Sequence, residues 1–214
     1  DSCTLELSIS GKVNGNSPDP HQHIFACFPG GKSCAGTNYP LNVAVIPAYV
    51  YVTNKNTNAV SQCLLNSSGS VEACTSLGNP GMTFTEPTGI TLNQAGTKAY
   101  VANGLFSNDY ASVSVCSIIN GIFSHCENSG SNLFNNPSSV TLNPMNTLAY
   151  VTNTMLGSNP TVSQCPILGD GSFGPCVSAE NNDLFSGPFG IAFDKSGTHA
   201  YITNEDSGDV FFCA

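Results

Sequence analysis

A near-identical sequence pattern recurs four times along this chain and constrains its fold more than any other feature. Each copy has a proline, a short apolar segment, a turn and then a Tyr-Val-Thr-Asn tetrapeptide or a close variant of it. The tetrapeptides begin at Tyr51, Tyr100, Tyr150 and Tyr201, so successive copies are 49, 50 and 51 residues apart. A repeat of this length cannot bury its own apolar face, and we therefore expect the copies to stack on one another.

Each copy reads as a small antiparallel sheet. An alternating apolar segment and the tetrapeptide, which is rich in β-branched and aromatic residues, predict two strands. The turns between them begin at Asn93, Asn143 and Asp194 and have Gly or Asn at the fourth position, where a positive φ is required. A third strand ends in cysteine, and in three copies a fourth strand carries another cysteine. Four strands per repeat are typical of a β-propeller blade.

The ten cysteines follow the same period. Facing positions on antiparallel strands are close enough for a disulfide, so each hairpin predicts one bridge. The expected pairs are Cys63 with Cys74, Cys116 with Cys126, Cys165 with Cys176 and, in a shortened hairpin, Cys27 with Cys34. Zinc binding is the alternative, but no Cys-x-x-Cys motif is present and no histidine accompanies each pair. Disulfides in this number indicate an oxidising compartment.

Two cysteines, Cys3 and Cys213, remain after the hairpins are paired. The last repeat lacks a fourth strand, which the N-terminal segment can supply, so we expect a Cys3–Cys213 disulfide that closes a ring. The same pair could instead join neighbouring subunits head to tail, which would produce a fibre. We favour the bridge within one chain because the ends of one ring have a high effective concentration.

The sequence therefore predicts an all-β fold, a β-propeller of five four-stranded antiparallel blades with a disulfide per blade and a ring closed by the N- and C-terminal strands. Four blades with an irregular arm are the alternative. We expect one domain over residues 1–214, with repeats at 40–76, 87–127, 137–177 and 188–213 and with 1–36 as a degenerate first blade plus the closing strand.

The composition favours an extracellular or cell-surface protein. Only 9% of residues are charged, against about a quarter in a typical soluble domain. A net charge of -9 without any arginine makes nucleic acid a poor partner, and no apolar segment is long enough for a transmembrane helix, so we expect no membrane insertion. Asn66 begins a glycosylation sequon in a predicted hairpin turn.

The repeated tetrapeptides, each after a Pro-x-x-apolar strand and a Gly-Thr or Asn-Thr turn, resemble the YVTN repeats of bacterial and archaeal β-propellers. The resemblance covers about residues 40 to 213. It implies a propeller fold, in a family that includes secreted and surface-layer proteins and is similar in pattern to lactonase-type propellers. This chain differs from the commoner seven-bladed members in its length and in its disulfides.

Few residues suggest a catalytic or metal-binding site. His21 and His23 would lie on one face of a strand and could bind a metal, although an exposed polar edge is the favoured interpretation. Glu205, Asp206 and Asp209 are weak candidates for a Ca²⁺ loop, but a solvated acidic turn is favoured because the EF-hand spacing is absent. The asparagines that end the four tetrapeptides could line one rim, or, as we favour, bond local backbone: Asn54, Asn103, Asn153 and Asn204. We expect no catalytic site and no cofactor.

Three functions remain for such a chain. The first and favoured one is a non-enzymatic structural or interaction module, such as a subunit of an extracellular filament or surface layer, with partners that are a surface protein, a glycan or further copies of itself. The second is a five-bladed lectin, which the absence of tryptophan disfavours because sugars stack on aromatic faces. The third is a lactonase-like hydrolase.

Overall fold

The computed structural model describes residues 25–27, 34–36, 48–66, 68–77, 84–104, 111–154, 161–179 and 185–213. The chain divides into two compact units, Asp1–Ile46 and Pro47–Ala214. In the first unit, β1 (Phe25–Cys27) and β2 (Cys34–Gly36) pair antiparallel with Cys27 opposite Cys34. The Cys27–Cys34 bridge itself stays a prediction. Cys3, His21 and His23 lie outside the described residues.

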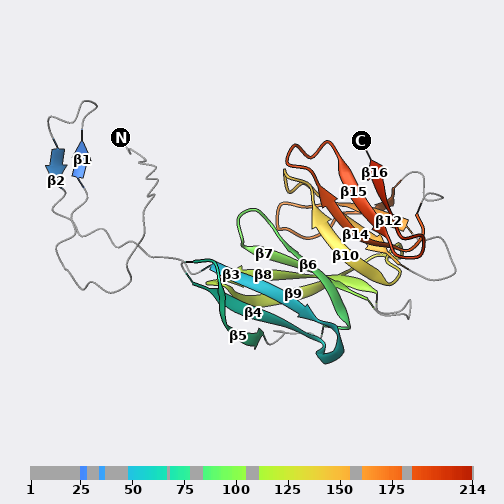
Figure 1. The fold of residues 1–214 in the computed structure, drawn as a ribbon, viewed down its shortest axis with the longest axis horizontal. Helices are drawn as coiled ribbons and strands as arrows, with labels where there is room; N and C mark the ends of the chain where they lie inside the picture. Colours follow the sequence, from blue (N-terminus) through green and yellow to red (C-terminus); the bar gives the residue numbers. More distant parts are fainter. Residues whose placement is uncertain are drawn as a thin grey trace. The chain divides into compact units, whose positions relative to one another are not determined.

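The second unit contains four antiparallel sheets whose strands follow one another in sequence (Figure 1). The first sheet has β3 (Ala48–Asn54), β4 (Ala59–Leu65) and β5 (Val71–Leu77), with a short 3-10 helix η1 (Lys55–Thr57) after β3. The second sheet has β6 (Pro87–Leu92), β7 (Lys98–Asn103), β8 (Ser112–Ile119) and β9 (Ile122–Gly130). The third sheet has β10 (Pro137–Leu142), β11 (Leu148–Asn153), β12 (Thr161–Pro166) and β13 (Val177–Ser178). The fourth sheet has β14 (Pro188–Phe193), β15 (Ala200–Asn204) and β16 (Asp209–Cys213).

This architecture confirms the all-β class and the strand order expected for each repeat. The tetrapeptides lie in β3, β7, β11 and β15, as their β-branched and aromatic residues predict. Two of the repeats form four-stranded sheets, whereas the first and fourth sheets have three strands each within the described residues. None of the helices that the structure describes has the length and apolar character needed to cross a membrane.

The turns between the first two strands of a repeat have the predicted chemistry. Asn93 Oδ1 accepts hydrogen bonds from the backbone N–H groups of Thr97 and Lys98, and Asn143 Oδ1 accepts the equivalent two bonds in the third sheet. The fourth turn residue has a positive φ, 66° at Gly96 and 55° at Asn146. The side-chain cap and the left-handed residue together fix a tight turn and hence the strand register.

The asparagines that end the second, third and fourth tetrapeptides anchor the loops leading into their own sheets. Asn103 Oδ1 accepts from the Thr85 N–H at 3.2 Å, and its Nδ2 donates to the hydroxyls of Ser112 and Ser114 on β8. Asn153 and Asn204 accept from backbone N–H groups at the same sequence distance of 18 residues. The predicted bonding to local backbone is seen at Asn54 and Asn153, which donate to the carbonyls two residues earlier, whereas the backbone partners of Asn103 and Asn204 lie 18 residues earlier.

The tetrapeptide tyrosines connect one sheet to the next. Tyr51 Oη donates to the Gly121 carbonyl at 2.7 Å, and its ring stacks on Phe123 at 5.6 Å. Tyr100 Oη donates to the Gly171 carbonyl at 3.0 Å, and its ring stacks on the corresponding phenylalanine of the third sheet at 5.5 Å. Burial raises the pKa of both phenols. Each tyrosine thus holds the outer hairpin of the following sheet.

Apolar cores lie between successive sheets. The core between the first and second sheets includes Val60, Leu77, Val101 and Phe123, and the core between the second and third includes Val113, Val140 and Val151. A smaller core joins Val162 of the third sheet to Phe185 and Ile202. Hydroxyl groups add links between first strands, because Thr88 Oγ1 donates to the Pro137 carbonyl and Ser138 Oγ to the Pro188 carbonyl. Stacking therefore supplies the burial that one repeat lacks.

Three disulfides join the cysteine pairs that the hairpin spacing predicts: Cys63–Cys74, Cys116–Cys126 and Cys165–Cys176. Cys213 differs, because its thiol is free and exposed. Its predicted partner, Cys3, lies outside the described residues, so the Cys3–Cys213 disulfide stays a prediction. Among the described strands, β16 pairs only with β15, and none places a cysteine opposite Cys213.

Candidate functional site

A row of polar side chains crosses one face of the second sheet. The strand register places Lys98 of β7 opposite Ser117 of β8, and Ser117 opposite His125 of β9. The next row on the same face contains Tyr100, Val115 and Glu127, because residues two apart on a strand point to the same side. A lysine from β7 and a histidine and a glutamate from β9 therefore share one surface.

A pocket of about 310 Å³ opens over this surface, between the second sheet and the hairpin that follows β12 of the third. Its size suits a small polar molecule. The lining residues are Lys98, Val115, Ser117, His125, Glu127, Asn128, Ser129, Asp170 and Ser172. Most of them can donate or accept hydrogen bonds, so the pocket favours a ligand rich in oxygen.

His125 and Glu127 form a hydrogen-bonded pair at the edge of this pocket. His125 Nε2 lies 2.8 Å from Glu127 Oε1. Cys126 between them points to the opposite face, where its disulfide to Cys116 is buried. When Nε2–H donates to the carboxylate, Nδ1 of the ring is left as the acceptor, which is the tautomer a general base requires.

Lys98 supplies the positive charge of the pocket. Its ammonium donates to Ser117 Oγ at 3.1 Å, and its alkyl chain lies against Gly171 of the neighbouring hairpin. Hydrogen bonds from Ser172 and, to a smaller extent, the Lys98 charge lower the pKa of Asp170. Asp170 is therefore a carboxylate at neutral pH and faces an ammonium across the gap between two sheets.

The equivalent gap between the first and second sheets is filled. Tyr49 occupies the position of Lys98, two residues before the tetrapeptide tyrosine, and its ring lies against Gly121. Gln62 also reaches this turn, where its Nε2 donates to the Gly121 carbonyl at 2.6 Å. Replacing an aromatic ring by the thin chain of lysine leaves room, which accounts for a pocket in the second gap.

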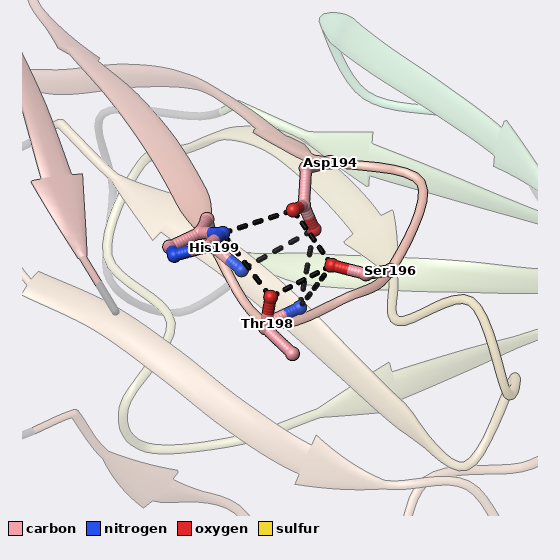
Figure 2. A network of polar contacts seen from close by, with 4 residues as sticks. All are labelled: Asp194, Ser196, Thr198 and His199. Carbon is pink, nitrogen blue, oxygen red and sulfur yellow. Dashed lines mark hydrogen bonds and ion pairs between the residues drawn. The ribbon is translucent and has the colours of Figure 1, made fainter.

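A second histidine and carboxylate pair lies in the turn between β14 and β15 (Figure 2). His199 Nδ1 is 2.9 Å from Asp194 Oδ2, and Ser196 Oγ donates to the same oxygen at 2.7 Å. Thr198 Oγ1 lies 3.1 Å from His199 Nδ1. These hydrogen bonds, first from His199 and then from Ser196, lower the pKa of Asp194.

This second cluster is a structural turn. Asp194 Oδ1 accepts from the backbone N–H groups of Thr198 and His199, the same two bonds that Asn93 and Asn143 make in their turns. Ser196 donates to the aspartate and not to the histidine, so the histidine does not activate it as a nucleophile. The cluster therefore fixes the β14–β15 turn.

The acidic loop that follows β15 is engaged in local structure. Asp209 Oδ1 accepts from Asn204 Nδ2 and Ser207 Oγ, and the backbone N–H groups of Glu205 and Asp206 donate to the carbonyls of Gly187 and Ser186. Across the described residues, no three His, Cys, Asp or Glu side chains gather in a metal-binding group, and these three carboxylates do not form one. Asn66 Oδ1 accepts from Ser68 and Ser70 in its turn, and glycosylation of its amide stays a prediction.

Sequence reasoning missed Lys98, His125, Glu127 and Asp170. A weak signal was present, because a His-x-Glu pattern around a disulfide cysteine on an expected strand places both side chains on one face. Lys98 and Asp170 could not be found in this way, since they are 72 residues apart in sequence and meet only through stacking of sheets.

No protein-family model matches the chain, and no curated protein matches it. Solved structures do share its fold. The periplasmic gluconolactonase PpgL of Pseudomonas aeruginosa is 13% identical with a TM-score of 0.57, over 78% of this chain and 49% of its own. A putative 6-phosphogluconolactonase of Bacteroides fragilis is 13% identical with a TM-score of 0.56, over 78% and 50%. Hydrazine synthase of Kuenenia stuttgartiensis is 17% identical with a TM-score of 0.54, over 77% and 42%.

These likenesses show a propeller-like fold. This chain spans half the length of these three structures or less. They also correct the expectation of a non-enzymatic structural module without a catalytic site, because lactonases use this fold. That expectation rested on the lack of a local catalytic motif, whereas the pocket draws its groups from separate strands and from two sheets. The three disulfides and a periplasmic neighbour are compatible with an extracellular or periplasmic location.

Proposed function

We propose that this protein is a lactonase-like hydrolase and that its site is the pocket between the second and third sheets. The observation that supports this most is the His125–Glu127 pair beside Lys98 in a pocket of about 310 Å³, on a fold that lactonases share. Opening a lactone requires a base for water and a positive group for the developing oxyanion. This pocket offers both.

In the proposed reaction, Glu127 orients His125, and Nδ1 of His125 accepts a proton from water as its oxygen attacks the lactone carbonyl carbon. Lys98 lies where its ammonium can stabilise the resulting oxyanion. The ring C–O bond then breaks, the carbonyl re-forms as a carboxylic acid, and the departing alkoxide takes the proton from His125. One water is consumed and one hydroxy acid is produced.

The test is hydrolysis of glucono-δ-lactone by the purified protein, followed in a pH-stat and corrected for spontaneous opening. We expect His125→Gln to lower kcat/KM about 100-fold or more, the usual contribution of a general base. His199→Gln is the matched control. His199 also pairs with a carboxylate, at 2.9 Å from Asp194 Oδ2, but it does not line the pocket, so this variant should change kcat/KM less than twofold. No rate above the spontaneous reaction, or equal losses in both variants, would contradict the proposal.

We further propose that the sheets belong to a closed five-bladed ring of the YVTN type in an extracellular or cell-surface protein. Support comes from the ends of the stack, because Val52 of the first sheet and Val210 of the fourth are exposed while Val101 and Val113, at equivalent positions in the second sheet, are buried. A closed ring of 214 residues has an expected radius of gyration of about 17 Å. Small-angle X-ray scattering that gave a clearly larger value would refute closure.

A further inference from the structure

The charges of the pocket distinguish between two kinds of lactone. Its charged groups are the Lys98 ammonium and the carboxylates of Glu127 and Asp170, with His125 paired to Glu127. With His125 neutral, the pocket therefore carries one more negative than positive charge. A ligand that brings further negative charge would meet two carboxylates and a single ammonium, and like charges in close contact oppose binding.

The Lys98 ammonium, the single positive group of the pocket, already has partners within the protein. Lys98 donates to Ser117 Oγ at 3.1 Å and lies close enough to Asp170 to lower the pKa of that carboxyl. Asp170 also accepts hydrogen bonds from the Ser172 hydroxyl and backbone N–H, which hold its carboxylate in place. A phosphate group would therefore compete with Asp170 for this one ammonium.

The chain offers no arginine for a phosphate group, because its five Lys and Arg residues are all lysines. Phosphate recognition in proteins usually relies on the bidentate guanidinium of arginine or on several converging donors. The other lining groups are neutral: Ser117, Asn128, Ser129 and Ser172. Hydroxyl and amide groups of this kind pair well with the hydroxyls of a sugar.

Building on the proposed function, we propose that the pocket takes an uncharged, polyhydroxylated lactone and rejects its phosphorylated counterpart. The substrate class is thus a neutral aldonolactone, in which the hydroxyls meet the serine and asparagine side chains and the ring carbonyl meets Lys98. Among proteins of similar fold, gluconolactonases and 6-phosphogluconolactonases both occur, so the fold alone does not decide between these substrates.

The experiment compares glucono-δ-lactone with 6-phosphoglucono-δ-lactone as substrates, and their non-hydrolysable lactam analogues as ligands in an NMR titration. We expect kcat/KM to be at least tenfold higher for the neutral lactone and only the neutral lactam to shift resonances of the pocket. Asp170→Asn should narrow this preference by several-fold, whereas Asp194→Asn, in the structural turn, should leave it unchanged.

Tighter binding or faster hydrolysis of the phosphorylated compound would overturn the inference, and so would a lack of binding by the neutral lactam. Binding of the neutral lactam without hydrolysis of either lactone would support the inference and refute the proposed hydrolase function. The failures of the two proposals are therefore distinguishable.

Discussion

The second and fourth sheets are built from the same repeat, yet the second lines the pocket of about 310 Å³ and the fourth does not contribute to it. Tyr100 is 1% exposed and its counterpart Tyr201 is 46% exposed, while Val115 is 8% exposed and its counterpart Phe212 is 56% exposed. Lys98 and His199 both follow a side-chain-capped turn at the same position. Lys98 meets the hairpin of the third sheet, whereas the His199 ring stacks on Phe212 of its own sheet.

This difference shows what a repeat does and does not specify. The repeat fixes the turn, the strand register and the face on which a side chain lies. The neighbouring sheet decides whether that face is a core, a pocket or an exposed surface. The same position can therefore hold a ring that fills a gap, as at Tyr49, or a lysine that leaves one open.

The strongest test of this difference is to remove the lysine charge near the β6–β7 turn of the second sheet and in the β14–β15 turn of the fourth. Lys98→Met keeps the length of the side chain and should lower kcat/KM for lactone hydrolysis about 10²- to 10³-fold, because an oxyanion would lose its positive neighbour. Lys195→Met changes a lysine in the turn before β15 and should leave kcat/KM within twofold. Comparable losses in both variants would show that net charge, and not the pocket, controls the reaction.

The disulfide of the second sheet should matter more than the free cysteine of the fourth. Replacing both Cys116 and Cys126 by serine should lower the free energy of unfolding by about 3 kcal/mol, the loop-entropy value for a bridge of this span. Cys213→Ser should change it by less than about 0.5 kcal/mol, as for most surface substitutions. Urea denaturation measures both values. A large loss from Cys213→Ser would indicate that its thiol has a structural partner in solution.

The tetrapeptide tyrosines provide a smaller effect. Tyr100→Phe removes the hydrogen bond to the Gly171 carbonyl and should cost about 1 kcal/mol, because a buried acceptor is left unpaired. Tyr201→Phe removes a hydroxyl from an exposed side chain and should be nearly neutral. Thermal unfolding of the two variants checks this. Equal effects would mean that the fourth sheet has a neighbour like that of the second.

The smallest predicted effect is on the stability of the fold at acidic pH. Hydrogen bonds lower the pKa of Asp194 in the folded state, so its carboxylate stabilises the fold above the unfolded pKa of about 4, and this contribution is lost as the pH falls through the lower folded value. Asp194→Asn keeps an oxygen for the turn, as Asn93 does, but removes the charge facing His199. We expect a slightly lower unfolding temperature than wild type at pH 7 and a difference that narrows below pH 4.

Asn143→Ala is the control for this acid experiment. It removes the same turn hydrogen bonds without removing an ionisable group, so its unfolding temperature should differ from that of wild type by a constant amount across this range. A constant difference for Asp194→Asn as well would show that the charge of Asp194 contributes nothing to stability.

Local spacing in the sequence was sufficient for the strands, the turns and the three hairpin disulfides. A tight turn and a cross-strand pair depend on residues a few positions apart, as Asn93 with Lys98 or Cys116 with Cys126. The site could not be predicted in the same way, because Lys98 and Asp170 belong to different repeats. The prediction of no catalytic site considered only groups within single segments, and the lactonases of similar fold correct it.

The disulfide between β8 and β9 has a consequence for the geometry of the pocket. Its half-cystine at residue 126 stands between His125 and Glu127, and a slip of β9 by one residue would turn both side chains away from the pocket. The bridge fixes the register of β9 against β8 covalently. In a reducing environment, backbone hydrogen bonds and the packing of Phe123 against Tyr51 would hold that register without a covalent link, so the pocket would keep its geometry less firmly.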